Sequence, residues 1–162
     1  MIKLLRIDDR LIHGQVAVSW TSHLGADTLV VASDAALSDA LMRTAFKMAK
    51  PPQVTLSIKS LEGAALVLNN PKHERRIILA VCASPADALI LAKRCAGIGE
   101  ICLGGVRQAP GRRRISGSVF LDEQDVAALR QIHELGKRVF LQSVPTERPM
   151  GFEAIVCAYE QG

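Results

Sequence analysis

The sequence has few aromatic residues and no long apolar run. Its 162 residues include one Trp, one Tyr and four Phe, too few for the base-stacking surfaces typical of proteins that bind single-stranded nucleic acid or RNA. No stretch of about 18 uncharged apolar residues is present, and the first residues lack the apolar run and cleavage site of a signal peptide. We therefore expect a cytoplasmic protein with no nucleic-acid partner.

Signatures of cofactor chemistry are also missing. The first turn lacks the G-x-G-x-x-G pattern of dinucleotide-binding folds, and the chain lacks a Walker A motif. The four cysteines have no metal-ligand spacing. Cys82, Cys102 and Cys157 lie in apolar runs that favour strands, so we expect buried, reduced thiols. The sequence predicts no metal and no cofactor.

The composition that remains is that of a soluble globular protein. Hydrophobic residues make up 49% of the chain and charged residues 22%, with a formal net charge of +4. This balance excludes both a disordered chain and a membrane protein. The excess positive charge favours a partner with an acidic surface, or a phosphorylated ligand.

Short apolar runs alternate with amphipathic segments along the whole chain. Strands are predicted at residues 2–7, 28–32, 54–58, 76–82, 101–103 and 138–144, and helices at 14–24, 38–49, 61–68, 85–96 and 123–135. Residues 104–118 read as an irregular, exposed loop. The alternation predicts an α/β fold with a doubly wound, mainly parallel open sheet, helices on both faces and a single domain over residues 1–162.

The turn after the first predicted strand, residues 8–14, carries the strongest chemical signal. Active sites of such sheets lie beyond the carboxyl ends of the strands. A neutral imidazole has an unperturbed pKa of about 6.5, so His13 offers a nucleophilic lone pair near pH 7. The backbone N–H groups of Gly14 and Gln15 begin the next helix, where an anion is favoured. A phosphoryl group on His13 fits this arrangement.

Charged neighbours support the same hypothesis. Arg10 lies in the same turn, and its planar guanidinium can hold the oxygens of a phosphoryl group in a loose transition state. Asp8 or Asp9 can accept a hydrogen bond from the other imidazole nitrogen or from Arg10. The sequence does not decide between the two carboxylates.

The segment RIDDRLIHGQV at residues 6–16, followed by Trp20, resembles the phosphorylation-site signature of the IIB components of mannose/fructose/sorbose-type phosphotransferase systems. The resemblance continues in order through residues 33–34, 43–49, 103–105, 118–119 and 142–145. It implies that His13 is the phosphorylated residue, with Nδ1 as the reacting nitrogen, and that Arg10 stabilises the phosphoryl group. Ser33 stands where Asn is common before Asp34.

The family implies a transferase that takes a phosphoryl group from a IIA phosphocarrier domain. It passes the group to a sugar bound by membrane IIC and IID subunits, through which the carrier associates with the inner face of the membrane. Two alternatives stay open: a regulatory phosphoprotein with this fold, and a nucleotide-binding module. The sequence does not identify the sugar.

Further residues have both a functional and a structural interpretation. Asp34 follows the second strand, Gly105 permits close backbone approach to phosphate, and Arg107 is the residue of the basic loop that we expect nearest the site. Arg112, Arg113 and Arg114 either dock an acidic partner or are merely solvated. We expect Trp20 in the core and the histidines other than His13 in structural roles. The sequence leaves the oligomeric state open, with a homo-oligomer as one possibility.

Overall fold

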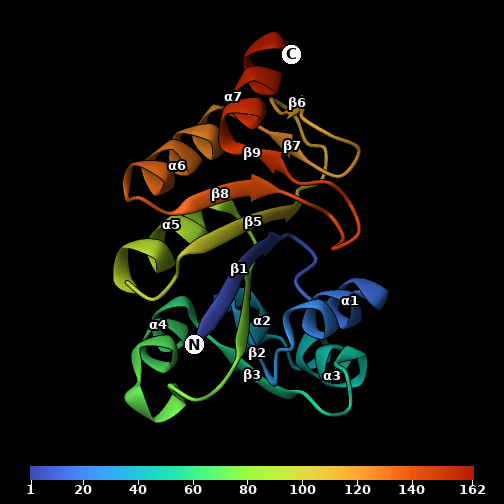
Figure 1. Ribbon diagram of the computed structural model, residues 1–162. Coiled ribbons are helices and arrows are strands. Elements are labelled where there is room, and N and C mark those ends of the chain that lie inside the picture. The colour runs from blue at the N-terminus through green and yellow to red at the C-terminus, as the bar shows by residue number, and fades with distance from the viewer.

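The computed structural model describes residues 1–162, which fold around a seven-stranded sheet (Figure 1). The strand order is β3-β2-β4-β1-β5-β8-β9, and every pairing is parallel except that of β8 with β9. The strands are β1 (Ile2–Asp8), β2 (Thr28–Ala32), β3 (Thr55–Lys59), β4 (Ile78–Cys82), β5 (Glu100–Gly105), β8 (Arg138–Leu141) and β9 (Met150–Gly151). The predicted doubly wound, mainly parallel sheet is confirmed.

Helices cover both faces of the sheet and divide the apolar side chains into two cores. A core of 15 buried residues lies under α1 (Gly14–Leu24), α2 (Asp34–Ser38) and α3 (Ala40–Ala49). A core of 26 buried residues lies under α4 (Leu61–Asn69), α5 (Pro85–Arg94), α6 (Glu123–Glu134) and α7 (Phe152–Gln161). Figure 1 shows α1 and α3 on one side of the sheet, with α4 and α5 on the other. No helix is long and apolar enough to span a bilayer.

Side-chain caps fix where several helices begin. The Ser84 side chain accepts from the Asp87 N–H at the start of α5, and Asp122 forms a reciprocal capping box with Asp125 at the start of α6. The helix predicted over residues 38–49 is α3, which begins at Ala40, and the short α2 before it was not predicted. Asp39 ends α2 in an extended conformation and caps α3 through the Met42 N–H.

The C-terminal region differs from the prediction. The last predicted strand stops at Leu141, and the chain continues through β9 into α7, which the sequence analysis did not predict. Cys157 therefore lies exposed on a helix, so its assignment to a buried strand was wrong. Cys82, Cys95 and Cys102 are buried and free, as expected.

The segment predicted as an irregular loop, residues 104–118, contains short strand pairings. Val106 forms a bridge with Val119, and β6 (Arg113–Arg114) pairs antiparallel with β7 (Phe120–Leu121). Ile115, the strongly apolar residue in the middle of this segment, is buried in the larger core. One short 3₁₀ helix, Pro71–His73, completes the fold.

Candidate functional site

The turn between β1 and α1 lies at the carboxyl edge of the sheet, at its centre, because β1 runs between β4 and β5. Leu11 adopts φ 61°, a left-handed conformation that is uncommon for a side-chain-bearing residue, and Gly14 adopts φ 50°. Leu11 and Ile12 are both buried in the smaller core. Their burial holds the turn in this conformation and leaves His13 at its end, with 29% of its side chain exposed.

Asp8 is the centre of the site. Its Oδ2 accepts from His13 Nε2 at 2.9 Å and from Arg6 Nη2 at 3.2 Å, while its Oδ1 accepts from the Arg10 N–H at 3.0 Å. An ionised carboxylate can only accept, so the imidazole proton is on Nε2. The lone pair of Nδ1 is therefore free.

Arg6 is the functional residue that the sequence analysis missed. It is only 3% exposed, donates to the Gln142 carbonyl at 3.1 Å and lies over the Trp20 ring, 5.4 Å from its centroid. A Cβ at Gly104 would overlap its guanidinium, so the absence of a side chain there makes room for it. A single arginine in an apolar strand, two residues before an aspartate on the same face, was the available signal.

The structure separates the roles of the two aspartates. Asp9 Oδ2 accepts from the Arg107 N–H at 2.8 Å and from Arg107 Nε at 3.1 Å, and so fixes the start of the basic loop. Asp8 alone contacts His13. Neither carboxylate bonds the Arg10 side chain, which is exposed at the rim.

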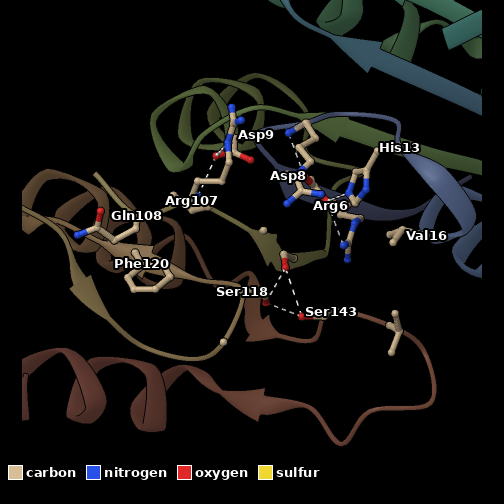
Figure 2. Close-up of a pocket in the computed structure, with 16 residues that line it drawn as sticks. Arg6, Asp8, Asp9, His13, Val16, Arg107, Gln108, Ser118, Phe120 and Ser143 are labelled. Atoms are coloured by element: carbon tan, nitrogen blue, oxygen red, sulfur yellow. Dashed lines mark hydrogen bonds and ion pairs between the residues drawn. The ribbon is translucent and has the colours of Figure 1, made fainter. Parts of the chain in front are cut away.

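These residues line one cavity of about 340 Å³ (Figure 2). Its charged part contains Arg6, Asp8, Asp9, Arg10, His13 and Arg107, whereas the remaining lining residues carry no charge. Figure 2 shows Ser118 and Ser143 across the opening from His13 and Asp8. Gly105 also lines the cavity, and a Cβ there would approach Asp8 Oδ1 to 3.2 Å.

Other candidate residues lie outside this cavity. The Asp34 carboxylate accepts from the Leu61 N–H at 2.9 Å, at the carboxyl end of β2. β4 lies between β2 and β1, and Asp34 does not line the cavity. Gly14 and Gln15 are not part of the lining, although their backbone N–H groups begin α1 and have no partner within the helix.

The three consecutive arginines of the basic loop bond to groups of the same chain, although Arg113 and Arg114 are exposed. Arg112 donates to the Arg107 carbonyl at 2.8 Å and pairs with Asp125 at 3.5 Å. Arg113 donates to the Tyr159 carbonyl at 3.0 Å and lies over that ring. Arg114 donates to the Ser116 carbonyl at 3.4 Å. Of the loop arginines, only Arg107 lines the cavity.

Two observations concern other kinds of chemistry at this site, a thiol nucleophile and a bound metal ion. Burial raises the pKa of the Cys102 thiol, next to Arg6, to about 11, so it stays protonated and is no nucleophile at neutral pH. No group of three or more His, Cys, Asp or Glu side chains is arranged to hold a metal ion. The cavity thus combines an imidazole whose Nδ1 has no partner with the arginines Arg6, Arg10 and Arg107, an arrangement suited to an anionic group such as a phosphoryl group.

Comparison with known proteins identifies the family. The model of the sorbose subfamily of phosphotransferase-system IIB components matches residues 2–161. The sorbose-specific EIIB component of Lacticaseibacillus casei is 35% identical over 91% of this chain and 90% of its own length. The IIBSor domain of the Klebsiella pneumoniae sorbose permease superimposes with a TM-score of 0.91, at 31% identity and 96% coverage of both chains. The protein belongs to this IIB family and is a phosphotransferase of sugar uptake.

One further relative bears on the domain organisation. The mannose-specific EIIAB component of Escherichia coli K12 is 31% identical over 91% of this chain, which corresponds to only 46% of the longer protein. The name of that relative records a IIA and a IIB component together. The family therefore includes chains in which the two components are covalently joined.

Proposed function

We propose that His13 accepts a phosphoryl group on Nδ1 from a phosphorylated IIA domain and passes it to a sugar. The observation that carries this proposal is the 2.9 Å bond from His13 Nε2 to Asp8, which leaves Nδ1 as the free nucleophile. Arg10, unbonded at the rim, stabilises the phosphoryl oxygens. The N–H groups of Gly14 and Gln15 support it through the helix N-terminus.

The phosphoryl group moves in two steps, from the donor histidine to His13 and from His13 to the sugar. The Nδ1 lone pair attacks phosphorus while the nitrogen–phosphorus bond of the donor histidine breaks, and the electron pair returns to the donor ring. Phosphorylated His13 keeps its Nε2 proton, so its ring is cationic and faces the Asp8 carboxylate. A sugar hydroxyl oxygen then attacks phosphorus, gives its proton to solvent, and releases His13 as the neutral imidazole.

Asp8 is the positioning residue in this scheme, and Arg6 holds Asp8. Arg6 is buried and paired with Asp8, so it neutralises the carboxylate, and the pair keeps the imidazole orientation constant. Asp9 fixes Arg107 at the mouth of the cavity, where its positive charge favours approach of an anionic partner. Gly105 keeps the space beside Asp8 open. Asp34 has no role in this scheme.

The partners follow from the family. We infer that a IIA domain is the donor, which the joined IIAB relative supports, and that membrane IIC and IID subunits present the sugar. Residues 1–162 would then act as one IIB domain at the cytoplasmic face of the membrane. Relatives named for sorbose, mannose and N-acetylgalactosamine leave the sugar open.

The test is transfer of labelled phosphate from phosphoenolpyruvate, through the general phosphotransfer proteins and a mannose-type IIA, to this chain. Wild type and His73→Ala should gain acid-labile phosphate, and His13→Ala should gain none. His73 is a matched control because it lies in the 3₁₀ helix, outside the cavity. If wild type took no label from phosphorylated IIA, the proposal would be refuted. If labelled wild type transferred no phosphate to any sugar in the presence of IIC and IID, the regulatory alternative would be favoured.

A further inference from the structure

Ser118 and Ser143 form a hydroxyl pair in the cavity that the phosphoryl chemistry does not use. Their Oγ atoms are 2.6 Å apart, and they lie 3.2 Å and 3.5 Å, respectively, from the Gly104 carbonyl oxygen. The two residues come from segments 25 positions apart in sequence. Figure 2 shows the pair facing the opening, opposite His13.

The number of protons in the pair determines what it can bind. Each serine hydroxyl has one proton and two lone pairs. One proton lies in the bond between the two Oγ atoms, and the other is donated to the Gly104 carbonyl, whichever serine donates it. What remains for a ligand is lone pairs. The pair therefore accepts hydrogen bonds, which a sugar hydroxyl can donate and a phosphoryl oxygen cannot.

The charges of the lining residues also favour a sugar hydroxyl, rather than a phosphoryl oxygen, beside the serine pair. Gly117, Ser118, Phe120, Ser143 and Val144 carry no charge. The charged side chain nearest the serine pair is the buried Arg6, which packs against Gly104 and is paired with Asp8. An anionic group is favoured next to the arginines, and a neutral polyhydroxyl group next to the serines. A volume of about 340 Å³ is within the range of small-ligand sites.

The pair is held rigidly in relation to the His13 helix. The Ser143 carbonyl accepts from Trp20 Nε1 of α1 at 3.0 Å, and the Ser143 N–H donates to Glu147 Oε2 at 2.7 Å. The Ser118 carbonyl accepts from the Val106 N–H at 3.0 Å. Since both backbones are anchored, the hydroxyls are preorganised for a ligand and lose little conformational entropy on binding.

We propose that Ser118 and Ser143 form a sugar-hydroxyl subsite, so that this chain itself contacts the sugar that receives the phosphoryl group. The inference rests on the proposed function and deepens it. It assigns the charged part of the cavity to the phosphoryl group and the uncharged part to the sugar ring. The carrier then contributes to sugar specificity together with the membrane subunits.

Binding of product-like probes to the purified protein tests this subsite. Dissociation constants for inorganic phosphate, mannose 6-phosphate, sorbose 1-phosphate and N-acetylgalactosamine 6-phosphate are measured from amide shifts in ¹H–¹⁵N NMR spectra. In wild type, at least one hexose phosphate should bind tighter than phosphate and shift the amides of Ser118 and Ser143. Ser118→Ala and Ser143→Ala should weaken that hexose phosphate about fivefold, as expected for one lost hydrogen bond. Inorganic phosphate should be unaffected.

The control variant is Ser57→Ala, on the edge strand β3 and outside the cavity, which should leave all four constants unchanged. Two results would overturn the subsite: equal weakening of inorganic phosphate, which would place the serines on the phosphoryl oxygens, or hexose phosphates that bind no tighter than phosphate to wild type. The wild-type comparison needs no variant, so misfolding of an alanine variant cannot hide the outcome. Labelling of His13 by charged IIA tests the proposed function separately.

Discussion

Gly104 makes possible the contact that orients His13, and a single methyl group tests its importance. In Gly104→Ala the new Cβ would overlap the buried Arg6 guanidinium. Overpacking a core typically costs about 1–3 kcal/mol, and separating the buried Arg6–Asp8 pair would add to that. A loss of about 2 kcal/mol lowers the melting temperature of a chain of this size by about 4–8 °C. Thermal unfolding measures this loss directly.

The same substitution should slow phosphorylation. If Arg6 moves, Asp8 loses its buried partner and the imidazole is displaced from its working orientation, which can cost about 100-fold in rate. We therefore expect initial labelling by charged IIA to fall at least about tenfold. Gly105→Ala, whose Cβ would lie 3.2 Å from Asp8 Oδ1, should have a smaller effect on both measurements.

Gly99→Ala is the matched control, because a Cβ there has no neighbour within 4 Å and the residue does not require a positive φ. It should keep the wild-type labelling rate and melt at the same temperature or slightly higher. If Gly104→Ala behaved like Gly99→Ala in both assays, the packing of Arg6 against Gly104 would not control the site, and the reasoning would be refuted.

Three further predictions concern single side chains. Arg10→Ala should slow phosphorylation of His13 by about 100-fold or more, with partial recovery in Arg10→Lys; equal rates for all three proteins would exclude a role for Arg10. Burial and the neighbouring Asp34 raise the pKa of Asp87, so its ionised form destabilises the fold above the ordinary value of 3.8. Asp87→Asn should therefore raise the melting temperature at pH 7, and the gain should shrink toward pH 4; a gain that did not change with pH would contradict this. One thiol, exposed Cys157, should react rapidly with a disulfide reagent in the native protein, and Cys157→Ser should abolish that fast phase; fast reaction of a second thiol would contradict the burial of the others.

The position of His13 could be predicted from the sequence because one continuous segment, residues 8–14, carries both the turn and its chemistry. The choice between Asp8 and Asp9 could not. Asp8 is the last residue of β1 and shares the face of Arg6, whereas Asp9 lies beyond the strand and bonds Arg107, 98 positions away. That partner depends on the pairing of β1 with β5, which local periodicity does not specify.

Two other differences also have a physical origin in strand order and composition. Asp34 follows the second strand in sequence, but β4 is inserted between β1 and β2, and Asp34 lies outside the cavity lining. The C-terminal helix was missed because its apolar run, with Ile155, Val156 and Cys157 in succession, shows no clear helical period. Ile155 is the one fully buried residue of α7, and Phe152, Ala158 and Tyr159 pack against the larger core beside it, so a narrow apolar stripe anchors this helix.

The left-handed Leu11 has a kinetic consequence. A residue in this conformation costs roughly 1–3 kcal/mol, which the burial of Leu11 and Ile12 offsets. The turn therefore cannot relax into another shape without withdrawing both side chains from the core. His13 is presented in its working orientation before any partner arrives, so no loop closure precedes the chemistry. On the proposed function, a partner therefore meets a turn that needs no rearrangement before transfer.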